Sequence, residues 1–178
     1  MVSLTVIAPP TIVDQPTSLV VAQGGSISFT VQASGQAPLT YQWFKDGTAI
    51  SGATSATYTI GSAATSDAGK YKVQISNAAG SATCNEVTLT VIQPPIITSQ
   101  PSSITVATGG TASFSVTATG SGTLTYRWYK DGQPISGATN STLTISGVKA
   151  SDAGSYKVVV TNEGIASTTS SSATLTVT

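Results

Sequence analysis

The sequence predicts an all-β protein made of two tandem antiparallel β-sandwiches, and two observations support this fold class. Apolar and polar residues alternate with a period of two almost throughout the chain, as in strands that bury one face. The stretch YQWFKDG at residues 41–47 returns as YRWYKDG at residues 126–132, so the chain consists of two copies of one unit. Each copy has room for roughly seven short strands separated by turn signals, a pattern typical of a sandwich.

The junction between the copies indicates where the domains begin and end. Residues 2–10 (VSLTVIAPP) closely match residues 87–95 (VTLTVIQPP), which close one copy and open the next. We therefore expect residues 1–7 to be the final strand of a preceding repeat, and the chain to be cut from a longer array. The two domains then span residues 8–92 and 93–178. Because paired prolines at the junction fix φ, we expect the domains to be in an extended, semi-rigid arrangement.

Composition excludes several classes of function. Charged residues make up 8% of the chain, and seven basic residues balance seven acidic ones. Without a basic stripe, nucleic acid is not expected as a partner, and without an apolar run of about 18 residues, membrane insertion is not expected. The chain has no histidine, which is the commonest general base and zinc ligand. We therefore predict no catalytic, cofactor-binding or metal-binding residues and no enzymatic activity.

The alternation also predicts which side chains fill the core of each domain. The two tryptophans share a strand face with Tyr41 and Tyr126. We therefore interpret each tryptophan as a buried core residue rather than as one that stacks on a ligand. Other strands place valine and tyrosine on their inward faces in the same way. The predicted core residues are Trp43, Val31, Val73 and Tyr71 in the first domain and Trp128, Val116, Val158 and Tyr156 in the second.

Two motifs carry a resemblance to a known family. The first domain has Trp43-Phe-Lys-Asp-Gly47 followed by Asp67-x-Gly-x-Tyr71, and the second repeats both as residues 128–132 and 152–156. With this spacing the whole chain resembles the immunoglobulin superfamily, and within it the I-set-like type. The resemblance implies that the corner tyrosine ties its hydroxyl back to the backbone of the preceding turn.

The chain departs from the family at the disulfide. The two family cysteines fall on Val31 and Val73, and on Val116 and Val158 in the second domain. The single cysteine, Cys84, cannot form a disulfide within the chain. Cysteine-free copies of this kind resemble those of bacterial surface and secreted proteins, and sometimes those of phage virions. The resemblance therefore implies an extracellular or cell-surface location, with a virion as the alternative, and neighbouring immunoglobulin-like repeats as partners.

A candidate binding face lies on the outward side of the tryptophan strand. An aromatic ring beside an amide or a base could stack on a sugar or dock a surface protein, with Lys72 and Lys157 expected on the neighbouring strand. The alternative is that each ring only covers Ile50 or Ile135. The residues of this candidate face are Phe44, Tyr129, Gln42 and Arg127.

The remaining polar residues have structural interpretations. Asp67 and Asp152 are one per domain, so we interpret them as turn caps rather than a catalytic carboxylate pair. A junctional ion at Asp14 or Glu86 is an alternative to solvated carboxylates, although no carboxylate cluster supports it. Cys84 lies near a one-residue insertion in the second copy, and we interpret it as a small buried thiol.

Three hypotheses for function follow from the sequence. The first is a non-catalytic spacer, structural or adhesion repeat of a longer extracellular protein. The second is a carbohydrate- or protein-binding accessory module of a secreted enzyme. The third is a surface module of a phage virion.

Overall fold

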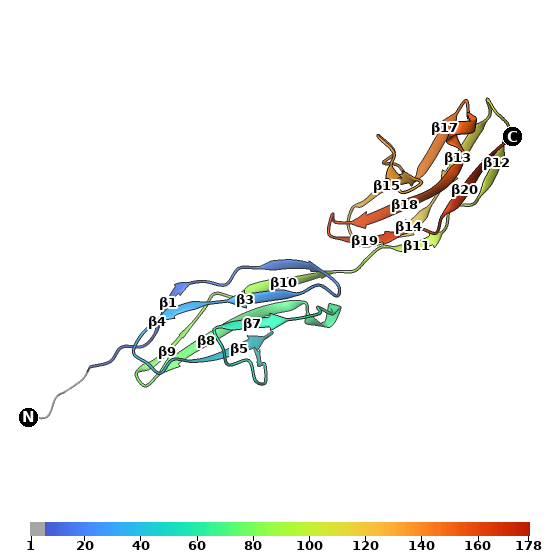
Figure 1. The fold of residues 1–178 in the computed structure, drawn as a ribbon. Helices are drawn as coiled ribbons and strands as arrows, with labels where there is room; N and C mark the ends of the chain where they lie inside the picture. The colour runs from blue at the N-terminus through green and yellow to red at the C-terminus, as the bar shows by residue number, and fades with distance from the viewer. Residues whose placement is uncertain (1–5) are drawn as a thin grey trace, which may run out of the picture. The chain divides into compact units, whose positions relative to one another are not determined.

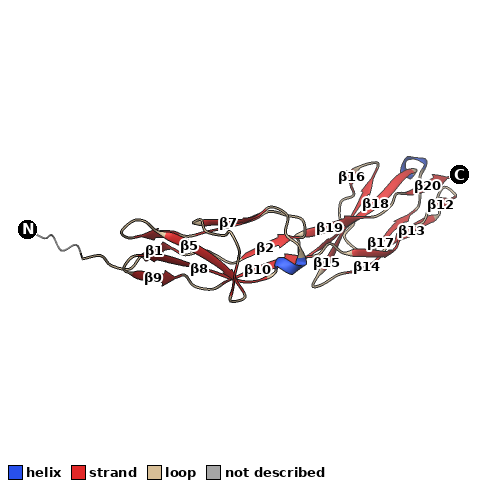
Figure 2. Ribbon diagram, turned by 90° about the horizontal axis from the view of Figure 1, so that it is seen from below, coloured by secondary structure: helices blue, strands red, loops and turns tan. Residues whose placement is uncertain are grey.

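The computed structural model describes residues 6–178, which divide into two compact units; the first ends at Val91 and the second begins at Ile92 (Figure 1). Most of the strand expected over residues 1–7 lies outside the described residues, and Val6 and Ile7 are not part of a strand. The described residues form strands and two short 3₁₀ turns, in agreement with the all-β prediction (Figure 2).

The first unit is a sandwich of two layers. One layer is a sheet in the order β2-β10-β8-β5-β6, with β9 also paired to β8, and the other contains the pairs β1–β4 and β3–β7. The strands are β1 Thr11–Asp14, β2 Leu19–Ala22, β3 Ile27–Thr30, β4 Gln32–Ser34, β5 Thr40–Lys45, β6 Thr48–Ala49, β7 Thr57–Ile60, β8 Gly69–Asn77, β9 Gly80–Thr83 and β10 Val87–Ile92.

The second unit repeats this topology. Its larger sheet runs β12-β20-β18-β15-β16 with β19 beside β18, and β11–β14 and β13–β17 form the facing layer. Strands β12 and β20 are parallel, whereas the other pairs with a defined register in this unit are antiparallel. The strands are β11 Ile96–Ser99, β12 Ile104–Val106, β13 Thr111–Ser115, β14 Thr117–Thr119, β15 Leu124–Lys130, β16 Gln133–Pro134, β17 Thr142–Ser146, β18 Gly154–Asn162, β19 Ala166–Thr169 and β20 Ala173–Val177.

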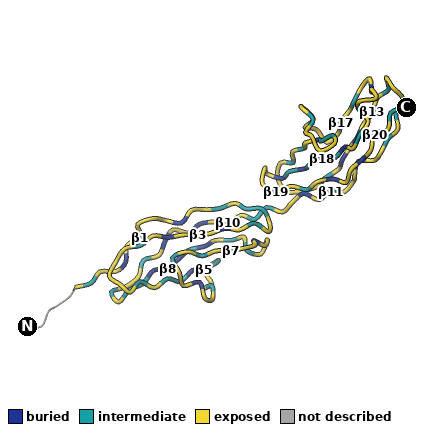
Figure 3. Tube along the Cα trace, in the orientation of Figure 1, coloured by how far each residue is buried: buried dark blue, intermediate teal, exposed yellow. Residues whose placement is uncertain are grey.

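Each unit has one hydrophobic core between its layers, where Figure 3 shows the buried positions alternating with exposed ones. Trp43 and Trp128 are fully buried, and each indole N–H donates 2.8 Å to a loop carbonyl, that of Ser55 or Asn140. The indole therefore fills the core without an unpaired donor. The other six residues predicted for the cores are also buried: Val31, Val73, Tyr71, Val116, Val158 and Tyr156.

The tyrosine of the second motif closes the 3₁₀ turn before β8. The Tyr71 hydroxyl donates to the Asp67 carbonyl at 2.7 Å, and the Asp67 carboxylate accepts the Ala64 amide at 2.8 Å. Tyr156 and Asp152 make the corresponding bonds in the second unit. Both aspartates therefore cap their turns, and the tyrosine hydroxyl bonds to backbone as the family resemblance implies.

The two sequence motifs meet in space, which explains why they occur together. Asp46, in the turn after β5, accepts the Lys70 amide of β8 at 2.8 Å. A Cβ added at Gly69 would lie only 2.6 Å from the Asp46 carboxylate, so a side chain at this position would displace that carboxylate. The Lys70 amide and the Lys45 ammonium hold the pKa of Asp46 below its usual value.

The one-residue insertion lies in the β18–β19 turn. The first unit joins β8 to β9 through two residues, whereas the second joins β18 to β19 through residues 163–165, with Glu163 and Gly164 at positive φ. In the first unit the Asn77 side-chain oxygen accepts the Ala79 amide, but the equivalent oxygen of Asn162 is buried and has no partner among the described residues. The second unit therefore lacks a hydrogen bond that the first unit makes within this turn.

Candidate functional site

The predicted binding face lies on the outward side of β5 and β8 in the first unit. In the antiparallel register Phe44 lies opposite Lys72 and Gln42 lies opposite Gln74, so these residues share one sheet face. On its other side Phe44 is paired with Ala49 of β6. The ring is half-buried, so neighbours cover part of it and leave part of it accessible.

The Gln42 side chain is committed to backbone rather than free to bind. Its amide nitrogen donates to the carbonyl of Trp43 at 2.9 Å and to that of Ile50 at 2.8 Å. These bonds hold the segment after β6 against β5, which is a structural task. The amide oxygen of Gln42 is the part of this group that remains for a ligand.

The second unit presents the same face with different chemistry. Tyr129 lies opposite Lys157 and Arg127 lies opposite Val159, and Tyr129 is half-buried while Arg127 is exposed. The exposed guanidinium of Arg127 offers a plane of hydrogen-bond donors to a ligand, whereas the amide nitrogen of Gln42 is already bonded to backbone. The structure therefore places the four predicted residues on equivalent faces of separate units, two on each.

A pair of asparagines, missed by the sequence analysis, anchors the segment that leads into each unit. The Asn77 side-chain nitrogen donates to the Ala8 carbonyl at 2.9 Å, and that of Asn162 donates to the Gln93 carbonyl at 3.1 Å. The signal was an asparagine at the same position of both repeats, as the last residue of β8 and of β18.

The prolines that follow these carbonyls pack closely on the same unit. A Cβ added at Gly80 would lie 3.2 Å from the Pro9 ring, and one added at Gly120 would lie 3.5 Å from Pro95. The Thr168 hydroxyl also bonds to the Pro95 carbonyl. Each leading segment is therefore held by the unit that follows it in the chain.

Cys84 is buried and acts as a hydrogen-bond acceptor. Its sulfur accepts the Val73 amide at 3.1 Å, and burial raises the pKa of the thiol. Ser170 occupies the equivalent place and accepts the Val158 amide at 2.9 Å. Aligning the repeats with the inserted residue included would have matched Cys84 to a serine and shown this role.

Glu86, one of the two carboxylates considered for a junctional ion, pairs with a lysine instead. Glu86 lies 3.0 Å from the Lys70 ammonium, which is otherwise solvated. No group of three or more potential ligands is close enough to hold a metal ion anywhere in residues 6–178. Within the same range, no helix is long and apolar enough to cross a membrane.

The buried tryptophan, the tyrosine corner and the two-layer topology define each unit as an immunoglobulin-type sandwich. The sequence model of the immunoglobulin domain matches residues 9–77 and 94–162. The chain belongs to this family, and its domains occur in tandem.

Individual relatives agree with this assignment. The chain is 34% identical over 167 residues to the mouse cell adhesion molecule DSCAML1, covering 86% of this chain and 8% of that protein. It is 31% identical over 166 residues to endoglucanase C of Cellulomonas fimi, covering 86% of this chain and 15% of that protein. Among solved structures, the titin I-band fragment I67–I69 has a TM-score of 0.75 at 27% identity, over 97% of this chain and 66% of that one.

The relatives limit what can be transferred to this chain. The chain spans a small part of the two curated proteins, so it corresponds to a module within each of them. Because one relative is from an animal and one from a bacterium, the expected bacterial origin stays a prediction. Immunoglobulin domains are generally non-catalytic modules.

Proposed function

We propose that this chain is a non-catalytic repeat unit of a longer extracellular or cell-surface protein, in which it serves as a semi-rigid spacer or adhesion module. The observation that carries the proposal is the bond from Asn162 to the Gln93 carbonyl. Gln93 belongs to the short segment that joins the domains, and a free linker would leave this carbonyl to water. The bond to Asn162 therefore restricts the directions in which this segment can leave the second domain.

Three further features support the spacer proposal. The segment continues into Pro94 and Pro95, whose fixed φ limits bending. The low charge and abundant hydroxyl groups of the surface keep a long array soluble without strong attraction to its neighbours. The similarity to the cell adhesion molecule DSCAML1 favours a surface-exposed parent protein.

Distance measurement between the domains tests the proposal. Spin labels at S28C and S113C, which are exposed and equivalent positions, would be placed in a C84S background and measured by pulsed electron paramagnetic resonance. We expect one narrow distance distribution that broadens in Asn162→Ala. Asn77→Ala is the matched control, since it releases Ala8 rather than the segment between the domains. A broad distribution in the parent protein, or an unchanged width in Asn162→Ala, would contradict the proposal.

A second candidate function is an accessory binding module of a secreted enzyme, which the similarity to endoglucanase C favours. Its binding faces would be the equivalent outward faces that contain Phe44 in the first unit and Tyr129 in the second. The test is retention on insoluble polysaccharides and on whole cells, compared with the Phe44→Ala/Tyr129→Ala double variant. Retention that is lost in the folded variant would favour this function, and no retention by either protein would leave the spacer function as the proposal.

A further inference from the structure

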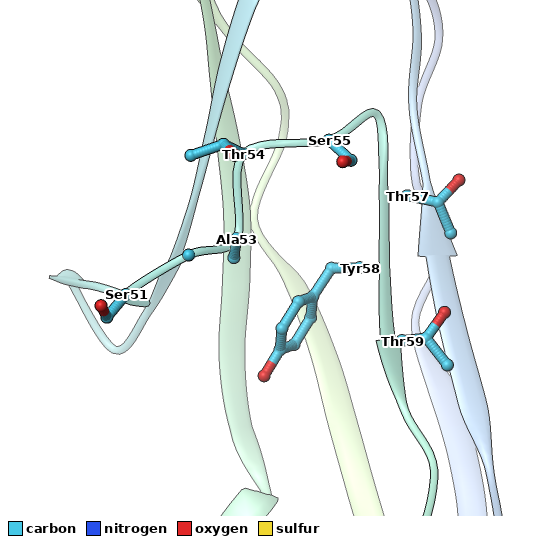
Figure 4. A pocket seen from close by; sticks show the side chains of 8 residues that line it. Ser51, Ala53, Thr54, Ser55, Thr57, Tyr58 and Thr59 are labelled. Carbon is cyan, nitrogen blue, oxygen red and sulfur yellow. The ribbon is translucent and has the colours of Figure 1, made fainter.

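A small hollow in the first unit lies away from the candidate binding face, in the facing layer of the sandwich. It has a volume of about 200 Å³ and lies between the loop after β6 and strand β7 (Figure 4). Figure 4 shows the Tyr58 ring on the Ala53 side of β7, with the Thr57 and Thr59 side chains on the opposite side of that strand. The lining residues are Ser51, Gly52, Ala53, Thr54, Ser55, Thr57, Tyr58 and Thr59.

The loop that forms one wall is held by the core tryptophan. The Trp43 amide donates to the Ala53 carbonyl at 3.0 Å, and its indole N–H donates to the Ser55 carbonyl at 2.8 Å. Within the loop, the Thr54 amide donates to the Gly52 carbonyl at 3.0 Å. The wall is therefore preorganised, so a ligand would not have to order it on binding.

The fold does not require a tyrosine at position 58. The second unit has Leu143 at the equivalent position, and Leu143 is buried in an otherwise similar core. Tyr58 packs its ring against Trp43 and Tyr71 at centroid distances of 6.2 and 6.0 Å, but it is only half-buried. Its hydroxyl makes no hydrogen bond to any described residue. Compared with leucine, tyrosine adds an aromatic surface and a free hydroxyl to the hollow.

The chemistry of the lining restricts the ligand. No lining residue is charged, and five of them carry Ser or Thr hydroxyl groups. Those of Thr57 and Thr59 bond to hydroxyl groups of β3, which leaves Ser51, Thr54 and Ser55 to offer hydroxyl groups beside the one aromatic ring. A neutral ring with an apolar face and several hydroxyl groups matches both features, because hydroxyl groups act as donors and acceptors at once. The volume is below the range of about 300–1,000 Å³ typical of drug-sized ligands, which favours a single ring.

We propose that the Tyr58 hollow binds one neutral sugar ring. This inference goes beyond the spacer function and does not depend on it, and it uses a different sheet from the face that contains Phe44. With so few heavy atoms in the ligand, the dissociation constant is expected to be on the order of 1 mM. The equivalent surface around Leu143 lacks the aromatic ring and serves as a control within the same molecule.

The test is an NMR titration of the full chain with glucose, galactose and N-acetylglucosamine, each up to about 50 mM. We expect saturable shifts of the amides of residues 51–59 with at least one of these sugars, and none for the equivalent residues 136–144. Tyr58→Leu, which copies the second unit and so preserves the core, is expected to weaken binding by about tenfold or more.

The controls separate sugar binding from non-specific effects. Glycerol at the same concentration is expected to leave residues 51–59 unshifted, since it has hydroxyl groups but no ring. The absence of a saturable shift with all three sugars would overturn the proposal, as would equal binding by a folded Tyr58→Leu variant. Equal shifts around residues 136–144 would also overturn it, because they would show that the aromatic ring is not needed.

Discussion

Replacing Cys84 with alanine tests the role of its sulfur as a hydrogen-bond acceptor. The Val73 amide lies 3.1 Å from this sulfur in a fully buried part of the sandwich. Alanine removes the acceptor without a polar replacement, so the amide would remain buried and unpaired. Serine, in contrast, keeps an acceptor, and Ser170 already provides one in the second unit.

The expected size of the effect follows from these contacts. An unpaired buried amide costs about 1–3 kcal/mol, so we expect Cys84→Ala to lower the free energy of unfolding of the first unit by that amount. Cys84→Ser should change it by less than about 1 kcal/mol, because the acceptor is retained. Ser170→Ala should lower the free energy of unfolding of the second unit by at least as much, since oxygen accepts more strongly than sulfur.

Urea titration followed by NMR measures both units in one sample, because each amide peak reports the unit that contains it. The shift in the urea midpoint of the first unit gives the free-energy change for each Cys84 variant. The reasoning would be refuted if both alanine variants were as stable as the parent protein to within about 0.5 kcal/mol. A destabilised Cys84→Ser variant would instead mean that the fit of the sulfur matters more than its acceptor role.

Three other predictions follow from the contacts around the β5 turn and the tyrosine corner. Gly69→Ala should destabilise the first unit by about 1–3 kcal/mol, because the new Cβ displaces the Asp46 carboxylate. A Cβ added at Gly61 would meet open space, so Gly61→Ala should change stability far less in the same urea titration. Folding lowers the pKa of Asp46, so the ionised carboxylate stabilises the first unit above pH 4 and this contribution is lost at lower pH. Asp46→Asn should therefore flatten the acid side of the curve of unfolding free energy against pH. Burial raises the pKa of Tyr71 to about 12, so among the six tyrosines of the chain ultraviolet titration should show a component near pH 12 that is lost in Tyr71→Phe, and the stability of the first unit should fall as the pH rises from 10 toward 12.

The period-two pattern predicted most of the fold because burial in a sandwich depends mainly on which face of a strand a residue occupies. Trp43 alternates with Tyr41 and Leu39, and all three pack in or against the first core. The same argument predicted the outward position of Phe44 and its neighbour Lys72, which the register places opposite each other. These inferences needed only local sequence and the approximate order of the strands.

The hydrogen bonds between distant segments could not be predicted in this way. Gln42 was a candidate for the binding face, but its amide nitrogen bonds to the Ile50 carbonyl because the segment after β6 returns to that edge of the sheet. The anchoring by Asn162 depends on how the end of β18 approaches the segment that contains Gln93, which strand periodicity does not describe. The Tyr58 hollow likewise depends on the path of a loop rather than on alternation.

The parallel pairing of β12 and β20 has a mechanical consequence for the second unit. Ile104, Thr105 and Val106 pair in register with Leu175, Thr176 and Val177, and the Thr108 amide adds a bond to the Thr178 carbonyl at 2.8 Å. Tension applied through the two ends of the domain pulls these strands in opposite directions along their length. The bonds between them then carry the load together in shear rather than opening one at a time, so this short pairing resists stretching while the rest of the sandwich remains folded.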